Sequence, residues 1–203
     1  MKKNKYRKEC HRKNQFIFAG RLDKTKGIDK LLKAWKLLSV NSEFTPILLV
    51  CGTGPEEEWC REFIIANSLE KSVKMLGFVE NKSAILHIAE SMALILPTQL
   101  YEGFPMTIVE AFGCGTPVLG SAIGNVESLV IEGVTGFTFD PYSSEEIADV
   151  VQIVMAMGIE KDDLFKSTYE YYKQHYTAQE NYKDLTNIYE KVLAKPPAKK
   201  GDS

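Results

Sequence analysis

The sequence predicts an α/β domain built on one doubly wound parallel sheet of about six strands, with helices on both faces. Three observations favour this fold class. Short apolar runs alternate with segments of helical periodicity along residues 16–157. The runs are apolar throughout rather than alternating, as in strands that are buried on both faces. The unusual glycines and charged residues fall directly after such runs, where a Rossmann-like sheet binds its ligands.

The strands and helices are placed in chain order from these patterns. Strands are expected at 16–19, 47–51, 73–78, 93–96, 117–119 and 136–139. Helices are expected at 28–38, 56–66, 83–89, 105–113, 144–157, 161–174 and 178–194. The first helix has apolar residues at 28, 31, 32, 35 and 38, the spacing of one buried helix face. Pro97 bounds the fourth strand, and Gly113 and Gly115 end the helix that opens at Pro105.

Composition limits the class of protein. The 203 residues include 25 Lys and Arg against 27 Asp and Glu, a formal net charge of −2, and 44% are hydrophobic. This balance suits one ordinary globular core and excludes a disordered or fibrous chain. It also argues against nucleic acid as the main partner, and no apolar run is long enough to span a membrane. The four cysteines are scattered without a C-x-x-C pair, which indicates a reducing, cytoplasmic location.

The ends of the chain differ from its middle. We expect residues 1–14 to form a strongly basic leader or a cut interdomain linker, 15–194 the folded domain with its C-terminal helices, and 195–203 a disordered tail. We interpret the leader as a solvated segment, with contact to an anionic membrane surface as the alternative.

The loop after the first strand, residues 20–27, has the chemistry of a phosphate site. Gly20 lets the backbone approach a ligand closely, and Arg21 and Lys26 place two cations beside a helix N-terminus. The alternative is that both cations are solvated. The loop Gly52-Thr53-Gly54-Pro55 after the second strand also permits close approach, although its glycines suit a purely structural turn equally well.

The segment after the fourth strand is the most informative. Pro105 at a helix start leaves the amides of Met106 and Thr107 free to point into the crevice. Glu110 lies in a helix that is otherwise apolar or small, so its carboxylate needs hydrogen-bond donors. Ribose hydroxyls would serve; Arg21 or a backbone amide is the alternative.

These motifs occur together in a recognisable order. Glu102 and Glu110 form an E-x7-E pair within E-G-F-P, and C-G-T-P-V follows at 114–118. With G-R-L-x-x-x-K-G at 20–27 and G-x-G-P at 52–55, the stretch from Phe16 to Pro141 resembles the C-terminal domain of a retaining GT-B glycosyltransferase of family 4, also called group 1.

The resemblance implies a fold and a set of roles. The fold would be the C-terminal, donor-binding half of GT-B, followed by extra helices. Arg21 and Lys26 would hold the pyrophosphate and stabilise the leaving nucleoside diphosphate, so that no metal or other cofactor is needed. Glu102 would hold hydroxyls of the transferred sugar and, with these two cations, complete the catalytic set. The implied donor-binding residues are Gly20, Gly52, Gly54, Phe78, Val79, Gly103, Phe104, Pro105, Met106, Thr107 and Glu110.

Phe78 and Val79 would contact the base, although Phe78 could instead be a core aromatic. The donor would be a UDP-sugar or another nucleoside-diphosphate sugar, and the acceptor a glycan or a lipid-linked glycan. We expect a role in bacterial cell-surface polysaccharide or glycoconjugate synthesis, in the cytoplasm or peripherally at the inner face of the membrane. The base, sugar, acceptor and linkage stay open.

A GT-B enzyme also needs an N-terminal acceptor domain, and the resemblance starts too early here to leave room for one. An excised domain, a truncated gene product and one subunit of a split transferase are the three explanations, and we favour the first. The chain alone should then bind donor and transfer sugar slowly or not at all. A nucleotide-sugar epimerase-like domain and a non-catalytic nucleotide-sugar-binding subunit remain alternatives. Tyr169, Tyr171, Tyr172 and Tyr176 form either an interface patch or ordinary packing.

Overall fold

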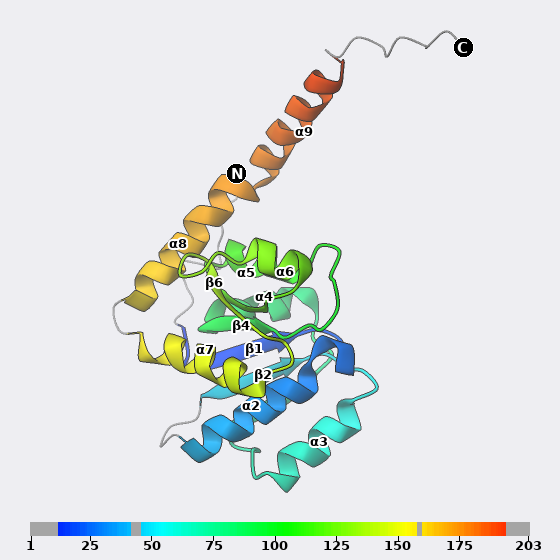
Figure 1. The fold of residues 1–203 in the computed structure, drawn as a ribbon, viewed down its shortest axis with the longest axis vertical. Helices are drawn as coiled ribbons and strands as arrows, with labels where there is room; N and C mark the ends of the chain where they lie inside the picture. The colour runs from blue at the N-terminus through cyan, green and yellow to red at the C-terminus, as the bar shows by residue number, and fades with distance from the viewer. Residues whose placement is uncertain (1–11, 42–45, 158–159, 194–203) are drawn as a thin grey trace, which may run out of the picture.

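The computed structural model describes residues 12–41, 46–157 and 160–193; the predicted tail 195–203 and residues 1–11 of the predicted leader lie outside it. Within the described ranges, six parallel strands form one sheet in the order β3-β2-β1-β4-β5-β6 (Figure 1). The strands are β1 (Gln15–Ala19), β2 (Ile47–Cys51), β3 (Val73–Gly77), β4 (Ala93–Leu96), β5 (Val118–Ser121) and β6 (Gly136–Phe139). The predicted doubly wound parallel sheet is confirmed.

The strand order reverses between β1 and β4. The chain adds β2 and β3 on one side of β1, then returns and adds β4, β5 and β6 on the other. β1 and β4 are paired in register at Phe16 with Ala93 and Ile17 with Leu94. The loops that follow these two strands therefore leave the sheet as neighbours, at the position where open α/β sheets form a ligand crevice.

Helices cover both faces of the sheet. They are α2 (Ile28–Asn41), α3 (Glu57–Ala66), α4 (Asn81–Glu90), α5 (Met106–Gly113), α6 (Gly124–Leu129), α7 (Ser144–Ala156), α8 (Glu160–His175) and α9 (Ala178–Leu193), with a 3-10 turn, η1 (Lys24–Lys26). In Figure 1, α2, α3 and α7 lie on one face and α4, α5 and α6 on the other. Alternate residues of β1 feed the two cores: Phe16 and Phe18 pack in the cluster that includes α2 and α7, and Ile17 packs in the cluster that includes α5.

Two local expectations differ from the structure. β3, one of the two edge strands of the sheet, is not buried on both faces: Lys74 is exposed and Leu76 is 37% exposed. α6 was not predicted, since its six residues are too few to show a helical period.

The described end of the basic leader is bonded into the domain. The Arg12 guanidinium donates to the carbonyl of Gly115 at 2.7 Å and to Thr116 Oγ1 at 2.9 Å. It also lies over the ring of Phe165 in α8, 4.0 Å from the ring centroid. Arg12 thus joins the turn before β5 to α8.

α8 packs against α5 through aromatic rings. Tyr171 and Tyr176 lie 6.2 and 6.1 Å from the ring of Phe112, centroid to centroid, and Tyr169 stacks on Tyr172 at 6.2 Å. All four tyrosines are half-buried. The structure therefore favours the packing interpretation of these tyrosines over a separate interface patch.

α9 extends away from the rest of the domain (Figure 1). It has no buried residue. Its exposed apolar side chains are Tyr182, Leu185, Ile188, Tyr189, Val192 and Leu193. In the described part of the chain, no helix is both long and apolar enough to cross a bilayer.

Three cysteines are buried, Cys51, Cys60 and Cys114. Burial raises the pKa of the Cys51 thiol to about 11 and that of Cys60 to about 12, and the negative charges of Glu56 and Glu57 add to the shift at Cys60. These thiols therefore stay protonated in the folded protein at pH values at which an unfolded chain already ionises them.

The free energy of unfolding is accordingly expected to fall as the pH rises above about 9, by up to about 1.4 kcal/mol per pH unit for each such thiol. Above that pH the unfolded state has lost the thiol proton that the native state still holds, so unfolding becomes easier. Urea unfolding at several pH values between 8 and 11 should show a shallower decline for Cys60→Ala than for the unmodified chain. Equal declines of the free energy of unfolding in the two proteins would contradict the raised pKa of Cys60.

Candidate functional site

The loops after β1 and β2 are held against each other by backbone contacts. The Leu22 amide donates to the carbonyl of Thr53 at 3.0 Å. Gly52 has a φ of +141°, and a Cβ there would lie 1.8 Å from the Gly20 carbonyl oxygen; a Cβ at Gly54 would lie 2.2 Å from that of Leu22. The two glycines therefore have a structural role in this contact, and a ligand contact by either stays a prediction.

The loop after β1 is also joined to the loop after β4. A Cβ at Gly27, where φ is +72°, would lie 1.9 Å from the Pro97 carbonyl oxygen, and the Gln99 amide donates to Thr25 at 2.8 Å. Asp23 caps η1 by accepting from the side chain and the amide of Thr25, and these hydrogen bonds lower the pKa of Asp23. The loops after β1 and β4 thus hold each other in place at the strand-order reversal.

A pocket of about 250 Å³ opens between these loops. Its lining is Phe18, Ala19, Gly20, Arg21, Lys26, Leu96, Glu102, Pro105, Met106 and Thr107. Arg21 is exposed, and no residue in the described ranges forms a hydrogen bond or ion pair with its guanidinium. Lys26 Nζ pairs with Glu102 Oε1 at 2.5 Å. The pocket therefore holds both predicted cations and one predicted carboxylate.

α5 points its N-terminus into this pocket. Pro105 is the N-cap and contributes no side-chain hydrogen bond. The amides of Met106 and Thr107 belong to the first turn, where a helix has no partners for its N–H groups, and the helix dipole is positive there. Two cations and a helix start around one small pocket form a site suited to a doubly charged anion.

Glu102 is held by residues that the sequence interpretation did not single out. Thr98 Oγ1 lies 2.9 Å from Glu102 Oε1, and Thr98 is fully buried. The side-chain amide of Asn125, in α6, donates to the carbonyl of Glu102 at 2.9 Å and also to that of Gly103. Asn125 follows β5, so a search of every strand end, including the fifth, would have found it.

Glu110 lies beside this pocket rather than in it. It is half-buried, and its Oε1 accepts from Asn81 Nδ2 at 2.9 Å, so among the described residues Asn81 is its partner rather than Arg21 or a backbone amide. Glu110 lines a larger groove of about 770 Å³ between α4, α5 and the C-terminal helices, together with Phe104. Met106 lines both cavities, which are therefore adjacent.

The segment after β3 lies near Glu110, since Asn81 follows it directly at the start of α4. Phe78 is 79% exposed, which excludes a core role for its ring. Val79 is half-buried and packs against the α5-side core cluster. The predicted base-contacting segment thus carries an exposed aromatic ring and leads directly into Asn81, the partner of Glu110.

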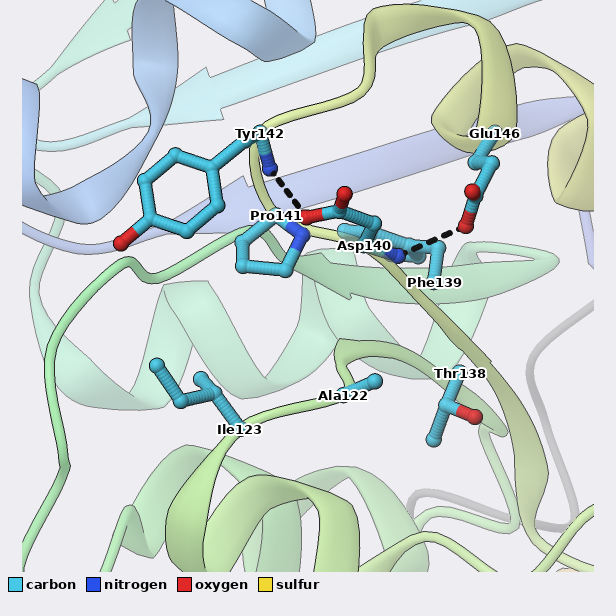
Figure 2. A pocket seen from close by; sticks show the side chains of 8 residues that line it. All are labelled: Ala122, Ile123, Thr138, Phe139, Asp140, Pro141, Tyr142 and Glu146. Carbon is cyan, nitrogen blue, oxygen red and sulfur yellow. Dashed lines mark hydrogen bonds between the residues drawn. The ribbon is translucent and has the colours of Figure 1, made fainter.

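A separate pocket of about 400 Å³ lies over the carboxyl ends of β5 and β6 (Figure 2). Its two acids are engaged in the turn before α7: Glu146 accepts from the Asp140 amide at 2.8 Å, and Asp140 accepts from the Tyr142 amide at 2.9 Å. We assign this pocket no ligand. Among the described residues, no three His, Cys, Asp or Glu side chains are grouped to hold a metal ion; metal independence stays a prediction.

The chain is similar in sequence to a known protein family. Residues 2–190 match the family model described as glycosyl transferases group 1. Sucrose synthase 1 of Hordeum vulgare is 26% identical over 155 residues, which are 69% of this chain and 19% of that protein. The chain spans less than half the length of the curated relatives that it matches.

Solved structures share the fold. Anabaena HepE in complex with UDP and glucose superposes with a TM-score of 0.74 at 22% identity, over 90% of this chain and 48% of that one. The C-terminal domain of a group 1 glycosyl transferase, LpcC from Francisella tularensis, gives a TM-score of 0.72 at 19% identity, over 84% of this chain and 90% of that one. The six-stranded parallel sheet with its flanking helices matches GT-B glycosyltransferase structures. With the family model covering nearly the whole sequence, this chain belongs to the glycosyl transferases of group 1.

Proposed function

We propose that this chain is the donor-binding domain of a retaining glycosyltransferase, which takes a sugar from a nucleoside-diphosphate sugar. The observation that carries this proposal is the 250 Å³ pocket at the strand-order reversal, where Arg21, Lys26, Glu102 and the start of α5 converge. Fixed cations and helix amides stabilise the negative charge that develops on a departing diphosphate. The group can then leave without a bound metal ion.

The donor would extend from this pocket in two directions. Arg21, Lys26 and the amides of Met106 and Thr107 would hold the diphosphate. Glu102, with the backbone of Gly103, Phe104 and Pro105, would accept hydroxyls of the transferred sugar.

On the other side, Glu110 would accept the ribose hydroxyls and the exposed ring of Phe78 would contact the base. The adjacency of the two cavities through Met106 supports this path.

A UDP-sugar is the donor that we propose first, since HepE, which shares the fold, was solved with UDP and glucose. The acceptor would be a glycan or lipid-linked glycan in bacterial surface polysaccharide or glycoconjugate synthesis, handled in the cytoplasm or at the inner membrane face. A separate N-terminal acceptor domain would position it. Since positioning and closure supply much of the rate of such a reaction, the chain alone should bind donor and transfer sugar slowly or not at all.

Isothermal titration of the 203-residue chain with UDP, GDP, ADP, their common sugars and inorganic pyrophosphate tests this function. We expect one nucleoside diphosphate and pyrophosphate to bind, with a matching rise in the melting temperature. Absence of binding by every nucleotide would contradict the donor site. Rapid sugar transfer by the chain alone would contradict the need for a second domain.

Glu110→Gln is expected to weaken UDP binding about tenfold while leaving pyrophosphate binding unchanged. The amide replaces a charged acceptor with a neutral one, and hydrogen bonds to charged groups contribute about 1.5–3 kcal/mol. Pyrophosphate has no ribose, so it should not sense the change. Calorimetry with both ligands measures the difference.

Glu58→Gln is the matched control, because it removes the same unit of charge at an exposed position on α3. This variant should bind both ligands as the unmodified chain does. Equal losses for UDP and pyrophosphate in Glu110→Gln would assign the carboxylate to the diphosphate or to the fold rather than to the ribose.

A further inference from the structure

The ion pair between Lys26 and Glu102 occupies the proposed diphosphate pocket. Lys26 ends η1 and Glu102 lies in the loop after β4, so two loops contribute one charge each. Their side chains are 28% and 20% exposed, and Nζ and Oε1 are 2.5 Å apart. Lys26 is therefore neutralised from within the protein, whereas Arg21 has no ion-pair partner among the described residues.

The same carboxylate oxygen has a second donor of a different kind. Thr98 Oγ1 is 2.9 Å from Glu102 Oε1 and 3.5 Å from the Thr25 carbonyl, so the carboxylate is the better acceptor for its single proton. The Thr98 side chain is fully buried, and its oxygen accepts from the Leu100 amide at 3.4 Å. Thr98 is thus a fixed partner of Glu102, whereas the flexible Lys26 side chain can move to another acceptor.

A diphosphate that enters this pocket competes with Glu102 for Lys26. It carries more negative charge than one carboxylate and offers several oxygens to the three ammonium protons. Once Lys26 turns to the phosphate, the carboxylate keeps the Thr98 hydrogen bond and has an unoccupied acceptor position toward the pocket.

We propose that Glu102 is the resident counter-ion of the diphosphate site: it neutralises Lys26 in the free protein, gives Lys26 up to an entering diphosphate, and is then held by Thr98 to accept a hydroxyl of the attached sugar. This inference rests on the proposed function, because it assumes that the pocket takes a nucleoside-diphosphate sugar. Thr98 acts here as a positioning residue.

The counter-ion has opposite effects on two ligands. A bare diphosphate must break the Lys26–Glu102 ion pair and offers Glu102 no hydrogen bond in exchange, so Glu102 weakens its binding. For a sugar nucleotide, the released carboxylate gains a hydroxyl, so part of the cost is recovered. Glu102 would therefore favour the donor over the nucleoside diphosphate that remains after transfer.

Glu102→Gln is expected to bind pyrophosphate and UDP about threefold to tenfold more tightly than the unmodified chain, since it removes a competing ion pair that is partly exposed. Glu90→Gln is the matched control. It removes an ion pair of the same 2.5 Å length, Lys13–Glu90, and the same unit of charge. Lys13 precedes β1, so this pair lies at the opposite end of the strands. Calorimetry that finds Glu102→Gln no tighter than Glu90→Gln overturns the proposal.

A double-mutant cycle tests the part of Thr98. Thr98→Val keeps the shape and removes the hydroxyl, so the released carboxylate loses its remaining partner, and pyrophosphate should bind about threefold more weakly. In the Glu102→Gln background, the same change should alter binding less than about twofold. Thr98→Ser should restore the affinity of the unmodified chain. Equal losses in both backgrounds would show a merely structural threonine and overturn its assigned role.

The outcomes separate this inference from the function on which it rests. If the unmodified chain binds neither UDP nor pyrophosphate, the diphosphate site is wrong and the counter-ion role falls with it. If it binds them and the Glu102→Gln and Glu90→Gln variants are indistinguishable, the proposed function stands and the counter-ion role alone is rejected.

Discussion

Arg21→Ala is expected to raise the dissociation constant of UDP about tenfold to a hundredfold. Arg21 lines the pocket between the loops after β1 and β4, and its guanidinium can offer two parallel N–H donors to a phosphate. Loss of charge-assisted hydrogen bonds costs about 1.5–3 kcal/mol each. Because Arg21 is exposed and its side chain forms no hydrogen bond within the described residues, the melting temperature of the unliganded chain should hardly change.

Arg61→Ala is the matched control for this change. Arg61 is an exposed arginine on α3 that pairs with Glu57, so its removal alters the net charge equally, away from the pocket. Titration calorimetry should find UDP affinity unchanged in this variant. Equal affinities in the Arg21→Ala and Arg61→Ala variants would remove Arg21 from the site.

Gly52→Ala should destabilise the fold by at least about 3 kcal/mol, the range of strongly disruptive substitutions. The methyl group would lie 1.8 Å from the carbonyl oxygen of Gly20, and the φ of +141° disfavours any side chain. The loops after β1 and β2 would have to separate, which also displaces Arg21. Urea unfolding measures the stability, and UDP binding should be lost with it.

Gly133→Ala separates backbone strain from steric overlap. Gly133 has a φ of +68°, and a Cβ there would meet no atom within 4 Å. This variant should lose only about 1–2 kcal/mol. If the Gly52→Ala and Gly133→Ala variants lose the same stability, the close contact between the two loops contributes nothing.

Much of the fold could be predicted because the central strands are buried on both faces. β1, β2 and β4 are nearly continuous apolar runs, and each ends at a glycine or a proline that stops it. That pattern is local, so it places strands and therefore the loops that carry Arg21 and Glu102. β3 differs because Lys74 and an exposed Leu76 mark an edge strand, a position that only the strand order determines.

The partners of the charged residues could not be predicted in the same way. Asn125 and Asn81 are common residue types, and their contacts with Gly103 and Glu110 join segments that follow different strands. Thr98 contacts Glu102 within one loop, which has no regular period from which the contact could be predicted. Spacing along one strand or helix carries no information about such contacts. The sequence predicts that the Glu110 carboxylate needs a hydrogen-bond donor, but not that Asn81 supplies it, because α5 turns that carboxylate toward α4 and an open groove.

Arg12 bears on where this folding unit can be cut. It precedes β1 and lies outside the limits of 15–194 that hydrophobic periodicity suggests, yet its guanidinium joins the Gly115 turn to Phe165 in α8. A truncation that begins at Gln15 would keep every strand and still lose the cation that ties the C-terminal helices to the sheet. Shortened versions of the domain therefore need to start at or before residue 12 to retain that tie.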